Sequence, residues 1–399
     1  MIVSTYQPRH CGIAVFSADL RSALLEADSS LSVEVVSMIR DGLEPHPPEV
    51  VATIRQDVAG DYRAAAELLN AAGSEAVLIE HEYGIFGGED GAYVIDLARS
   101  VDAPVVVTLH TVLADPSPGQ AAVLRALCDA ATLVMVFTGT ARRMVLDQGL
   151  AGPERVRVVP HGAPELLAAG AWSGAGSARA PTEPDPARSL GLPSLAGRTV
   201  LSTFGLISAA KGLELAIGAL PAVVAAHPEV VYLIAGQTHP EVISHEGESY
   251  RLRLERLVRD LSLDEHVAFL DRFLTVEELA ALLARTDLYL TPYRSRDQIV
   301  SGALTFAVAA GCPVVSTPYF YAEDLLRTGA GVLVPFDHPE AWAAAVLELL
   351  DSPEKLAAAR AEARRVGAEL TWPSVGKATL EVLAEAAGAP VRHEDRDRR

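Results

Sequence analysis

Lysine is rare in this chain, and one lysine stands where a phosphate group is expected to bind. Only three of the 33 Lys plus Arg residues are lysine, namely Lys211, Lys355 and Lys377. Lys211 is the last residue but one of the segment Gly205–Gly212, which follows an apolar strand-like run and leads into a helix. A basic side chain at a helix N-terminus opposes the helix dipole, and a bound phosphate offsets that mismatch. Gly205 and Lys211 are therefore predicted to hold phosphate, with a solvated lysine as the alternative.

Two other segments offer backbone N–H groups to an anion. Ser301 and Gly302 stand between a strand-like run and an apolar helical run, where their N–H groups would face a phosphate and Ser301 would also cap the helix. Gly12 lies between the first strand and a helix expected to start near Val15. A glycine at that place lets a ligand approach the backbone. The alternative for Gly12 is an ordinary tight turn.

The loop 81–91 has the composition of a sugar-binding loop, because carboxylates accept hydroxyl hydrogens and aromatic rings cover the apolar faces of sugars. It follows a strand-like run, and its aromatic side chains are expected to be exposed. A flexible surface loop is the alternative. The predicted acceptor-binding residues of this loop are His81, Glu82, Tyr83, Phe86 and Gly87.

His110 ends another apolar run, 104–110. A lone histidine is more often structural than catalytic. Its place at the carboxyl end of a buried parallel strand favours a functional role, because ligands of such sheets bind there.

These residues are carried by two successive series of alternating strands and helices, which predict parallel sheets covered on both faces. The first series occupies 1–165 and the second 199–370, and a Gly-, Ala- and Pro-rich linker or long loop spans 166–198. Residues 389–399 form a charged tail. The predicted strands are 1–5, 31–38, 76–80, 104–110, 132–137, 155–160, 199–204, 230–235, 267–270, 288–291, 313–316 and 331–334.

Composition excludes several classes of protein. The formal net charge of −19 repels nucleic acid and anionic lipid, so neither is an expected partner. No run of apolar residues is long enough to span a membrane, and the N-terminus resembles a strand rather than a signal peptide. Three widely spaced cysteines argue against disulfides and zinc and fit a reducing cytoplasm.

Several common catalytic motifs are absent. The chain has no dinucleotide-binding glycine fingerprint opening a helix, no P-loop, no nucleophile elbow and no His-Glu-x-x-His. Its Asp-x-Asp sequence, 395–397, stands in the charged tail, so no metal site is predicted.

Together these segments resemble family 4 glycosyltransferases, the retaining enzymes of the glycosyl transferases group 1 with GT-B fold. The resemblance covers nearly the whole chain and includes Gly302–Tyr319 and the closing helix after Trp372. It implies two Rossmann-like α/β domains facing across a cleft, with the helix at about 372–388 packing back on the N-terminal domain. It also implies that Lys211 contacts the donor phosphate, that Gly12 lies near that phosphate and that His110 lies near the donor sugar.

The resemblance further implies a bacterial hexosyltransferase, mannosyl or glucosyl, that uses a UDP- or GDP-sugar as substrate and needs no cofactor or metal. In such enzymes Lys211 and N–H groups near Gly12, Ser301 and Gly302 would stabilise the leaving diphosphate. A phosphate oxygen would take the proton of a carbohydrate or small-molecule acceptor.

Three positions depart from the family pattern. Leu206 stands where the family usually has an arginine, and the paired glutamates of the family fall on Gln298 and Phe306. Gln298 is still expected to bind the donor sugar, whereas Phe306 cannot accept a hydrogen bond from ribose. These departures leave two alternatives: a phosphorylase-like or epimerase-like enzyme on the same fold, or a non-catalytic sugar-binding protein.

Overall fold

The fold is described from a computed structural model of the 399-residue chain. It covers residues 1–9, 11–40, 46–168, 195–336 and 338–388, so most of the predicted linker (166–198) and the whole charged tail (389–399) lie outside the described residues. The chain divides into two compact units. The first consists of Met1–Gly162 and Trp372–Arg399, and the second of Ala163–Thr371.

The first unit is built on a seven-stranded parallel sheet of order β3-β2-β1-β4-β5-β6-β7. The chain leaves β1 towards one edge of the sheet and returns to build the other edge from β4, so the direction of winding changes between these two neighbours. The strands are β1 (Ile2–Ser4), β2 (Val35–Ile39), β3 (Val50–Arg55), β4 (Val77–His81), β5 (Val105–Leu109), β6 (Leu133–Val136) and β7 (Val156–Val158).

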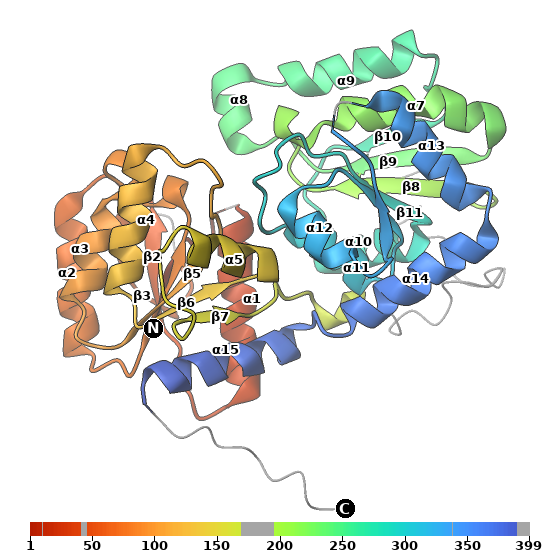
Figure 1. The fold of residues 1–399 in the computed structure, drawn as a ribbon. Coiled ribbons are helices and arrows are strands. Elements are labelled where there is room, and N and C mark those ends of the chain that lie inside the picture. Colours follow the sequence, from red (N-terminus) through yellow and green to blue (C-terminus); the bar gives the residue numbers. More distant parts are fainter. Residues whose placement is uncertain (10, 41–45, 169–194, 337, 389–399) are drawn as a thin grey trace, which may run out of the picture. The chain divides into compact units, whose positions relative to one another are not determined.

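Helices cover both faces of this sheet, with α2, α3 and α4 on one side and α1 and α15 on the other (Figure 1). Helix α15 packs along α1, where a side chain at Gly376 would lie 2.5 Å from the Ala23 carbonyl oxygen. The helices are α1 (Gly12–Ala27), α2 (Ala59–Ala71), α3 (Tyr93–Ser100), α4 (Pro118–Ala130), α5 (Gly139–Asp147) and α15 (Trp372–Ala386), with short 3₁₀ turns η1 (Tyr83–Ile85) and η2 (Glu89–Gly91).

The second unit is built on a six-stranded parallel sheet of order β10-β9-β8-β11-β12-β13. Here the direction of winding changes between β8 and β11, which are neighbours in the sheet. The strands are β8 (Thr199–Phe204), β9 (Val230–Ala235), β10 (Val267–Leu270), β11 (Leu288–Thr291), β12 (Val314–Ser316) and β13 (Gly331–Leu333).

The helices of the second unit pack in the same layered way, α7 against α9 and α13, and α11 against α14. They are α7 (Leu213–Ala226), α8 (Pro240–Glu246), α9 (Ser249–Asp260), α10 (Val276–Arg285), α11 (Gly302–Ala309), α12 (Phe320–Leu326), α13 (Pro339–Leu350) and α14 (Pro353–Gly367); the 3₁₀ turns are η3 (Glu165–Leu167) and η4 (Ala209–Lys211).

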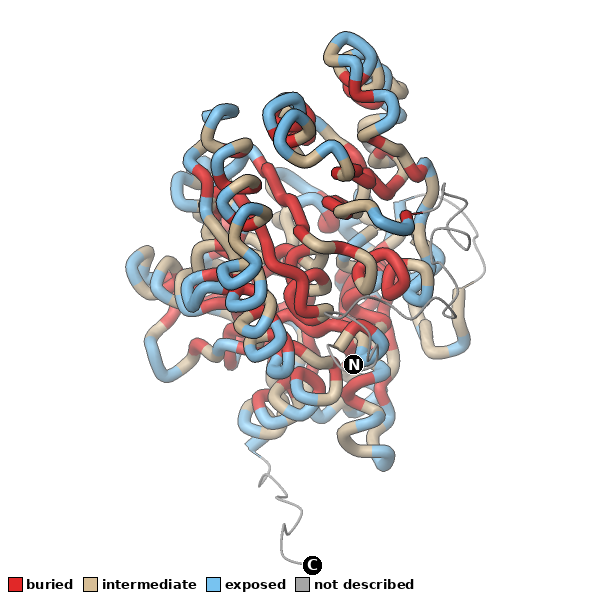
Figure 2. The backbone as a smooth tube through the Cα atoms, turned by 90° about the vertical axis from the view of Figure 1, so that its right-hand side faces the viewer, coloured by how far each residue is buried: buried red, intermediate tan, exposed pale blue. Residues whose placement is uncertain are grey.

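Local chemistry explains where many of these elements begin. Ser117 and Thr275 start α4 and α10 with reciprocal capping boxes to Gln120 and Glu278. The central strands of both sheets are almost wholly buried and the outward helix faces are exposed, as expected for sheets covered on both sides (Figure 2).

The predicted α/β class with two parallel sheets is confirmed, and two local expectations are wrong. Strand β3 has no counterpart among the predicted strands, because it is an edge strand with only one buried side chain, Ile54. Helix α1 starts at Gly12 rather than near Val15, because the Cys11 sulfur caps it by accepting from the Ala14 N–H. Among the described residues no helix is both long and apolar enough to cross a membrane.

Candidate functional site

In the second unit, two predicted phosphate-binding segments come together at the point where the winding of the sheet changes direction. Gly205–Gly212 follows β8, and Pro292–Ser301 follows β11, its neighbour in the sheet. Ligands of doubly wound sheets bind beyond the carboxyl ends of the strands at such a switch point. The topology therefore brings the segments that carry Lys211 and Ser301 to the same edge of the sheet, although these residues are ninety positions apart in sequence.

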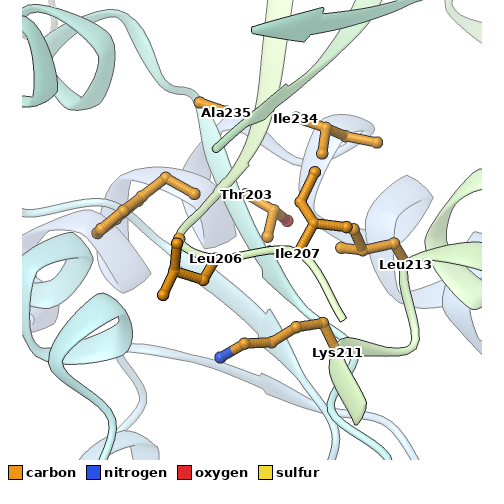
Figure 3. A pocket seen from close by; sticks show the side chains of 9 residues that line it. Thr203, Leu206, Ile207, Lys211, Leu213, Ile234 and Ala235 are labelled. Carbon is orange, nitrogen blue, oxygen red and sulfur yellow. The ribbon is translucent and has the colours of Figure 1, made fainter. Parts of the chain in front are cut away.

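A shallow hollow lies at this edge. Its cavity volume of about 10 Å³ is far below that of a typical ligand pocket, about 300–1,000 Å³, so the hollow marks an edge where a ligand could contact the protein and does not enclose one. Among the lining residues Lys211 carries the charge and the others are apolar or neutral (Figure 3). They are Thr203, Phe204, Gly205, Leu206, Ile207, Lys211, Leu213, Ile234 and Ala235.

Gly205 gives a ligand access to the backbone at this hollow. Its φ of +119° is a backbone angle that residues other than glycine rarely adopt. No atom lies within 4 Å of the place where a Cβ would stand. Its carbonyl oxygen is approached by Gly236, where a Cβ would lie 2.0 Å away. The close approach of these two loops requires glycine at position 236, and the open side of Gly205 remains available to a ligand.

Lys211 is the last residue of η4 and stands one residue before Gly212, the N-cap of α7. Its Nζ donates a hydrogen bond of 2.7 Å to the Tyr293 hydroxyl and lies 3.9 Å from the centroid of that ring. Burial raises the pKa of Tyr293, but the adjacent ammonium and the surrounding hydrogen bonds outweigh burial and hold it below its ordinary value.

Ser301 and Gly302 stand at the N-terminus of α11, as predicted. The Ser301 hydroxyl accepts a hydrogen bond of 3.3 Å from the Leu304 N–H, which confirms its capping role. Gln298 is exposed, and its amide donates to the Val300 carbonyl at 2.8 Å. Its side chain thus supports its own loop.

Two of the three positions that depart from the family pattern, Leu206 and Phe306, are apolar and partly accessible. The Phe306 ring stacks on Phe204 with centroids 6.4 Å apart and an interplanar angle of 21°. Both rings, like Leu206, are only half-buried. A ligand at this surface meets aromatic and aliphatic groups instead of the carboxylate and guanidinium of the usual pattern.

In the first unit, the corresponding switch point lies between β1 and β4. Gly12 is the first residue of α1 after β1, is exposed and has no atom within 4 Å of the place where a Cβ would stand. The free N–H groups of the first turn of α1 are therefore approachable by an anion.

His110 directly follows β5 and is tied to a buried carboxylate. Its Nε2 lies 2.7 Å from Glu80 Oε2, and the histidine and glutamate are 6% and 0% exposed. Thr108 donates to the other oxygen of Glu80 at 3.2 Å. Glu80 therefore fixes the orientation of the His110 ring and leaves Nδ1 as the nitrogen that can face a ligand.

Aromatic rings surround this histidine. Phe16 and Phe137 each lie 5.0 Å from the His110 ring, and Phe16 also contacts Trp372 and His161. Burial lowers the pKa of His161 to about 4, although the Gly162 carbonyl partly opposes the shift. His161 is therefore neutral at physiological pH.

The predicted acceptor loop needs correction, because its aromatic side chains are not exposed. Phe86 is 2% exposed and stacks on the buried His81 ring at 5.9 Å, and Tyr83 is half-buried. Burial lowers the pKa of His81 to about 3. Glu82 is half-buried and accepts from the Tyr83 N–H at 2.9 Å.

Gly87 also has a structural rather than a ligand-facing position. A Cβ there would lie 1.8 Å from the Gln56 carbonyl oxygen, and the Gly87 N–H donates to the Tyr62 hydroxyl at 2.7 Å. The loop is thus an ordered connection of two 3₁₀ turns. As placed, His81, Phe86 and Gly87 support the loop, and only Glu82 and Tyr83 of the predicted set are accessible.

Sequence reasoning missed three residues of these sites. Glu80 had a signal, since it is the charged residue of an otherwise apolar strand. His161 follows β7 as His110 follows β5, so the same argument applied to it. Tyr293 carried no local signal, because only the tertiary structure brings it to Lys211.

Among the described residues, no group of three or more His, Cys, Asp or Glu side chains is placed to hold a metal ion. All three cysteines are free thiols.

Comparison with known proteins finds a family that the second unit resembles. A model of the family described as glycosyl transferases group 1 matches residues 198–352, which include both segments of the Lys211 site. The second unit is thus similar to the group 1 glycosyltransferases.

Curated relatives of this chain are bacterial. It is 28% identical over 300 residues to the D-inositol 3-phosphate glycosyltransferase of Thermobispora bispora, covering 71% of this chain and 65% of the relative. It is 29% identical over 179 residues to the GDP-mannose-dependent monoacylated alpha-(1-6)-phosphatidylinositol monomannoside mannosyltransferase of Corynebacterium glutamicum, covering 43% and 44%. The chain thus spans about half to two thirds of the length of these relatives.

Solved structures share the fold over nearly the whole chain. Anabaena Alr3699/HepE in complex with UDP has a TM-score of 0.71 at 16% identity, covering 96% of this chain and 99% of that one. Sucrose-phosphate synthase from Thermosynechococcus elongatus has a TM-score of 0.73 at 18% identity, covering 96% and 98%. The two Rossmann-like units therefore form the GT-B fold.

Proposed function

We propose that this protein is a retaining, metal-independent glycosyltransferase that moves a mannosyl or glucosyl group from a UDP- or GDP-sugar to a carbohydrate or small-molecule acceptor in the cytoplasm. The observation that carries the proposal is the position of Lys211. Its ammonium lies at the switch point of the second sheet, beside the open backbone of Gly205. A fixed cation at such an edge suits the diphosphate of a sugar nucleotide.

In the proposed reaction, the bond between the anomeric carbon and the donor phosphate breaks as the acceptor oxygen bonds to the same face of that carbon. Lys211 and the N–H groups of Gly12, Ser301 and Gly302 would stabilise the negative charge of the leaving diphosphate. A phosphate oxygen would take the proton of the acceptor. His110, oriented by Glu80, would contact the donor sugar.

The names of similar proteins support a sugar nucleotide as the donor. A curated relative is named as GDP-mannose-dependent, and a structure of similar fold contains UDP-glucose. The free thiols fit a reducing compartment.

Thermal-shift measurements against UDP-, GDP- and ADP-sugars, with EDTA present, test the proposal. A ligand at about one hundred times its dissociation constant stabilises a protein by about 2.7 kcal/mol, which is readily measured. We expect one nucleotide class to stabilise the protein and to be turned over in EDTA. An absolute need for manganese or magnesium would contradict the metal-independent reaction.

The aromatic pair Phe204 and Phe306 favours a second candidate, a phosphorylase-like enzyme. The stacked rings provide no hydrogen-bond acceptor for ribose hydroxyls, and a sugar 1-phosphate has no ribose to bind. Cleavage of an oligosaccharide by inorganic phosphate, without stabilisation by any sugar nucleotide, would support this alternative over transfer.

A further inference from the structure

The loop that carries Lys211 is fastened to the segment that follows β11. The Arg294 N–H donates to the Ala210 carbonyl at 3.0 Å. Gly212 adopts a φ of +60°, and a Cβ there would lie 2.2 Å from the Pro292 carbonyl oxygen. Contacts on both sides of Lys211 therefore hold its backbone against Pro292–Arg294, with Tyr293 at the centre of that segment.

A charged contact fixes the same two segments from the side. Arg294 lies 2.5 Å from Glu214 in the first turn of α7, and the second oxygen of Glu214 accepts from the Tyr250 hydroxyl at 2.5 Å. Arg294 is exposed, so the ion pair adds little stability by itself. Its importance is that it sets the register between the two segments.

Tyr293 is itself immobilised. The residue is 2% exposed, and its ring stacks on Tyr319 with centroids 5.0 Å apart and an interplanar angle of 16°. Its carbonyl oxygen accepts a hydrogen bond of 2.6 Å from the Thr317 hydroxyl. Tyr293 follows β11, and contacts with Thr317 and Tyr319, which follow β12, hold it in place. Its phenol oxygen therefore has a fixed position at the edge of the sheet.

This fixed oxygen contacts the ammonium of Lys211. A lysine side chain has four rotatable bonds and loses much rotamer freedom when it is ordered. The Nζ of Lys211 donates a hydrogen bond of 2.7 Å to the Tyr293 hydroxyl, which orders the lysine side chain. An ammonium has three donors, so two remain for an anion.

We propose that Tyr293 is a positioning residue, which holds the Lys211 ammonium in place so that its two remaining N–H groups meet the diphosphate of the donor. The inference rests on the proposed function and names a determinant of the same site. The depressed pKa of Tyr293 accords with a phenol lying close to a cation. Tyr293 acts through Lys211 and need not touch the substrate.

A double-mutant cycle measured with inorganic pyrophosphate tests this role without requiring turnover. Isothermal titration would compare the wild-type protein, Tyr293→Phe, Lys211→Met and the double variant. Tyr293→Phe keeps the ring that stacks on Tyr319 and removes only the hydroxyl. We expect Tyr293→Phe to weaken pyrophosphate binding about tenfold, and to have no further effect once Lys211 is methionine.

Tyr321→Phe is the matched control. Tyr321 is equally buried in the same unit, but its hydroxyl pairs with Thr305 at 2.6 Å. The control removes a buried phenol hydroxyl away from the cation, so pyrophosphate binding should be unchanged. With the preferred sugar nucleotide, Tyr293→Phe should lower kcat more than it raises KM, because the leaving diphosphate gains charge in the transition state.

Several outcomes would overturn the inference. Equal pyrophosphate affinity of Tyr293→Phe and the wild type would do so. An undiminished effect of Tyr293→Phe in the Lys211→Met background would show that Tyr293 acts by another route. Failure of the wild type to bind pyrophosphate would remove the phosphate site and this role together. The expected cycle without turnover of any sugar nucleotide would refute the proposed function alone and leave the positioning role standing.

Discussion

Replacing Lys211 by alanine is the perturbation with the largest expected effect on catalysis. The ammonium is half-buried at the edge of the second sheet. Two unit charges about 4 Å apart interact by about 4 kcal/mol at an effective dielectric constant of about 20. Loss of a preorganised donor to a developing negative charge typically costs about 2.7–4 kcal/mol. We therefore expect Lys211→Ala to lower turnover by about a hundred- to a thousandfold.

The fold should survive the same change. Lys211→Ala removes the 2.7 Å hydrogen bond to the buried Tyr293 hydroxyl, and a buried polar group that loses a partner costs about 1–3 kcal/mol. This cost remains below the stability of an ordinary protein, about 5–15 kcal/mol.

The assay is the initial rate of nucleoside diphosphate release with the donor that the thermal-shift panel selects. Lys355→Ala is the control, because Lys355 is exposed on α14 and pairs with Glu348 at 2.7 Å. Its rate should equal that of the wild type. Lys211→Arg should recover only part of the loss, since a planar guanidinium does not replace a compact ammonium. Transfer by Lys211→Ala at the wild-type rate would refute the assignment of the phosphate site.

Two further predictions concern stability. Gly87→Ala should destabilise the fold by about 2–4 kcal/mol in urea unfolding, because its Cβ would lie 1.8 Å from the Gln56 carbonyl oxygen. Gly84→Ala is the control and should be tolerated, because its Cβ would meet no atom within 4 Å. Equal unfolding midpoints of the two variants would contradict the packing argument. Burial lowers the pKa of His161 to about 4 from its ordinary value of 6.5, so the unfolded chain binds the proton first as the pH falls. His161 alone should therefore lower the free energy of unfolding by about 2 kcal/mol from pH 7 to pH 5. His161→Leu should make that fall smaller by about the same amount, and an unchanged pH dependence would count against it.

Local patterns in the sequence were enough to predict most elements of the fold. The second-unit strands Thr199–Phe204, Val230–Ala235, Val267–Leu270 and Leu288–Thr291 have the predicted bounds. Buried parallel strands are continuous apolar runs, which are visible without knowledge of the rest of the chain. Lys211 was also found locally, by the rarity of lysine and its place before a helix.

The elements that the sequence did not reveal are those whose environment is set by distant residues. The edge strand β3 buries only Ile54, so it lacks the apolar run of a central strand. Phe86 lies in a loop whose composition is typical of sugar binding, yet its side chain is buried and its ring stacks on His81. Gly87 is required by the Gln56 carbonyl, which lies thirty-one positions earlier in the chain.

The tertiary structure alone decided how the site is assembled. Strand order puts β8 beside β11, and this pairing brings Tyr293 to Lys211 across 82 positions of sequence. The pairing of β4 with β5 likewise brings Glu80 to His110. A sequence specifies which residues are buried and where strands end through local periodicity. The neighbours of each strand end follow from long-range pairing in the sheet, which no local pattern of residues encodes.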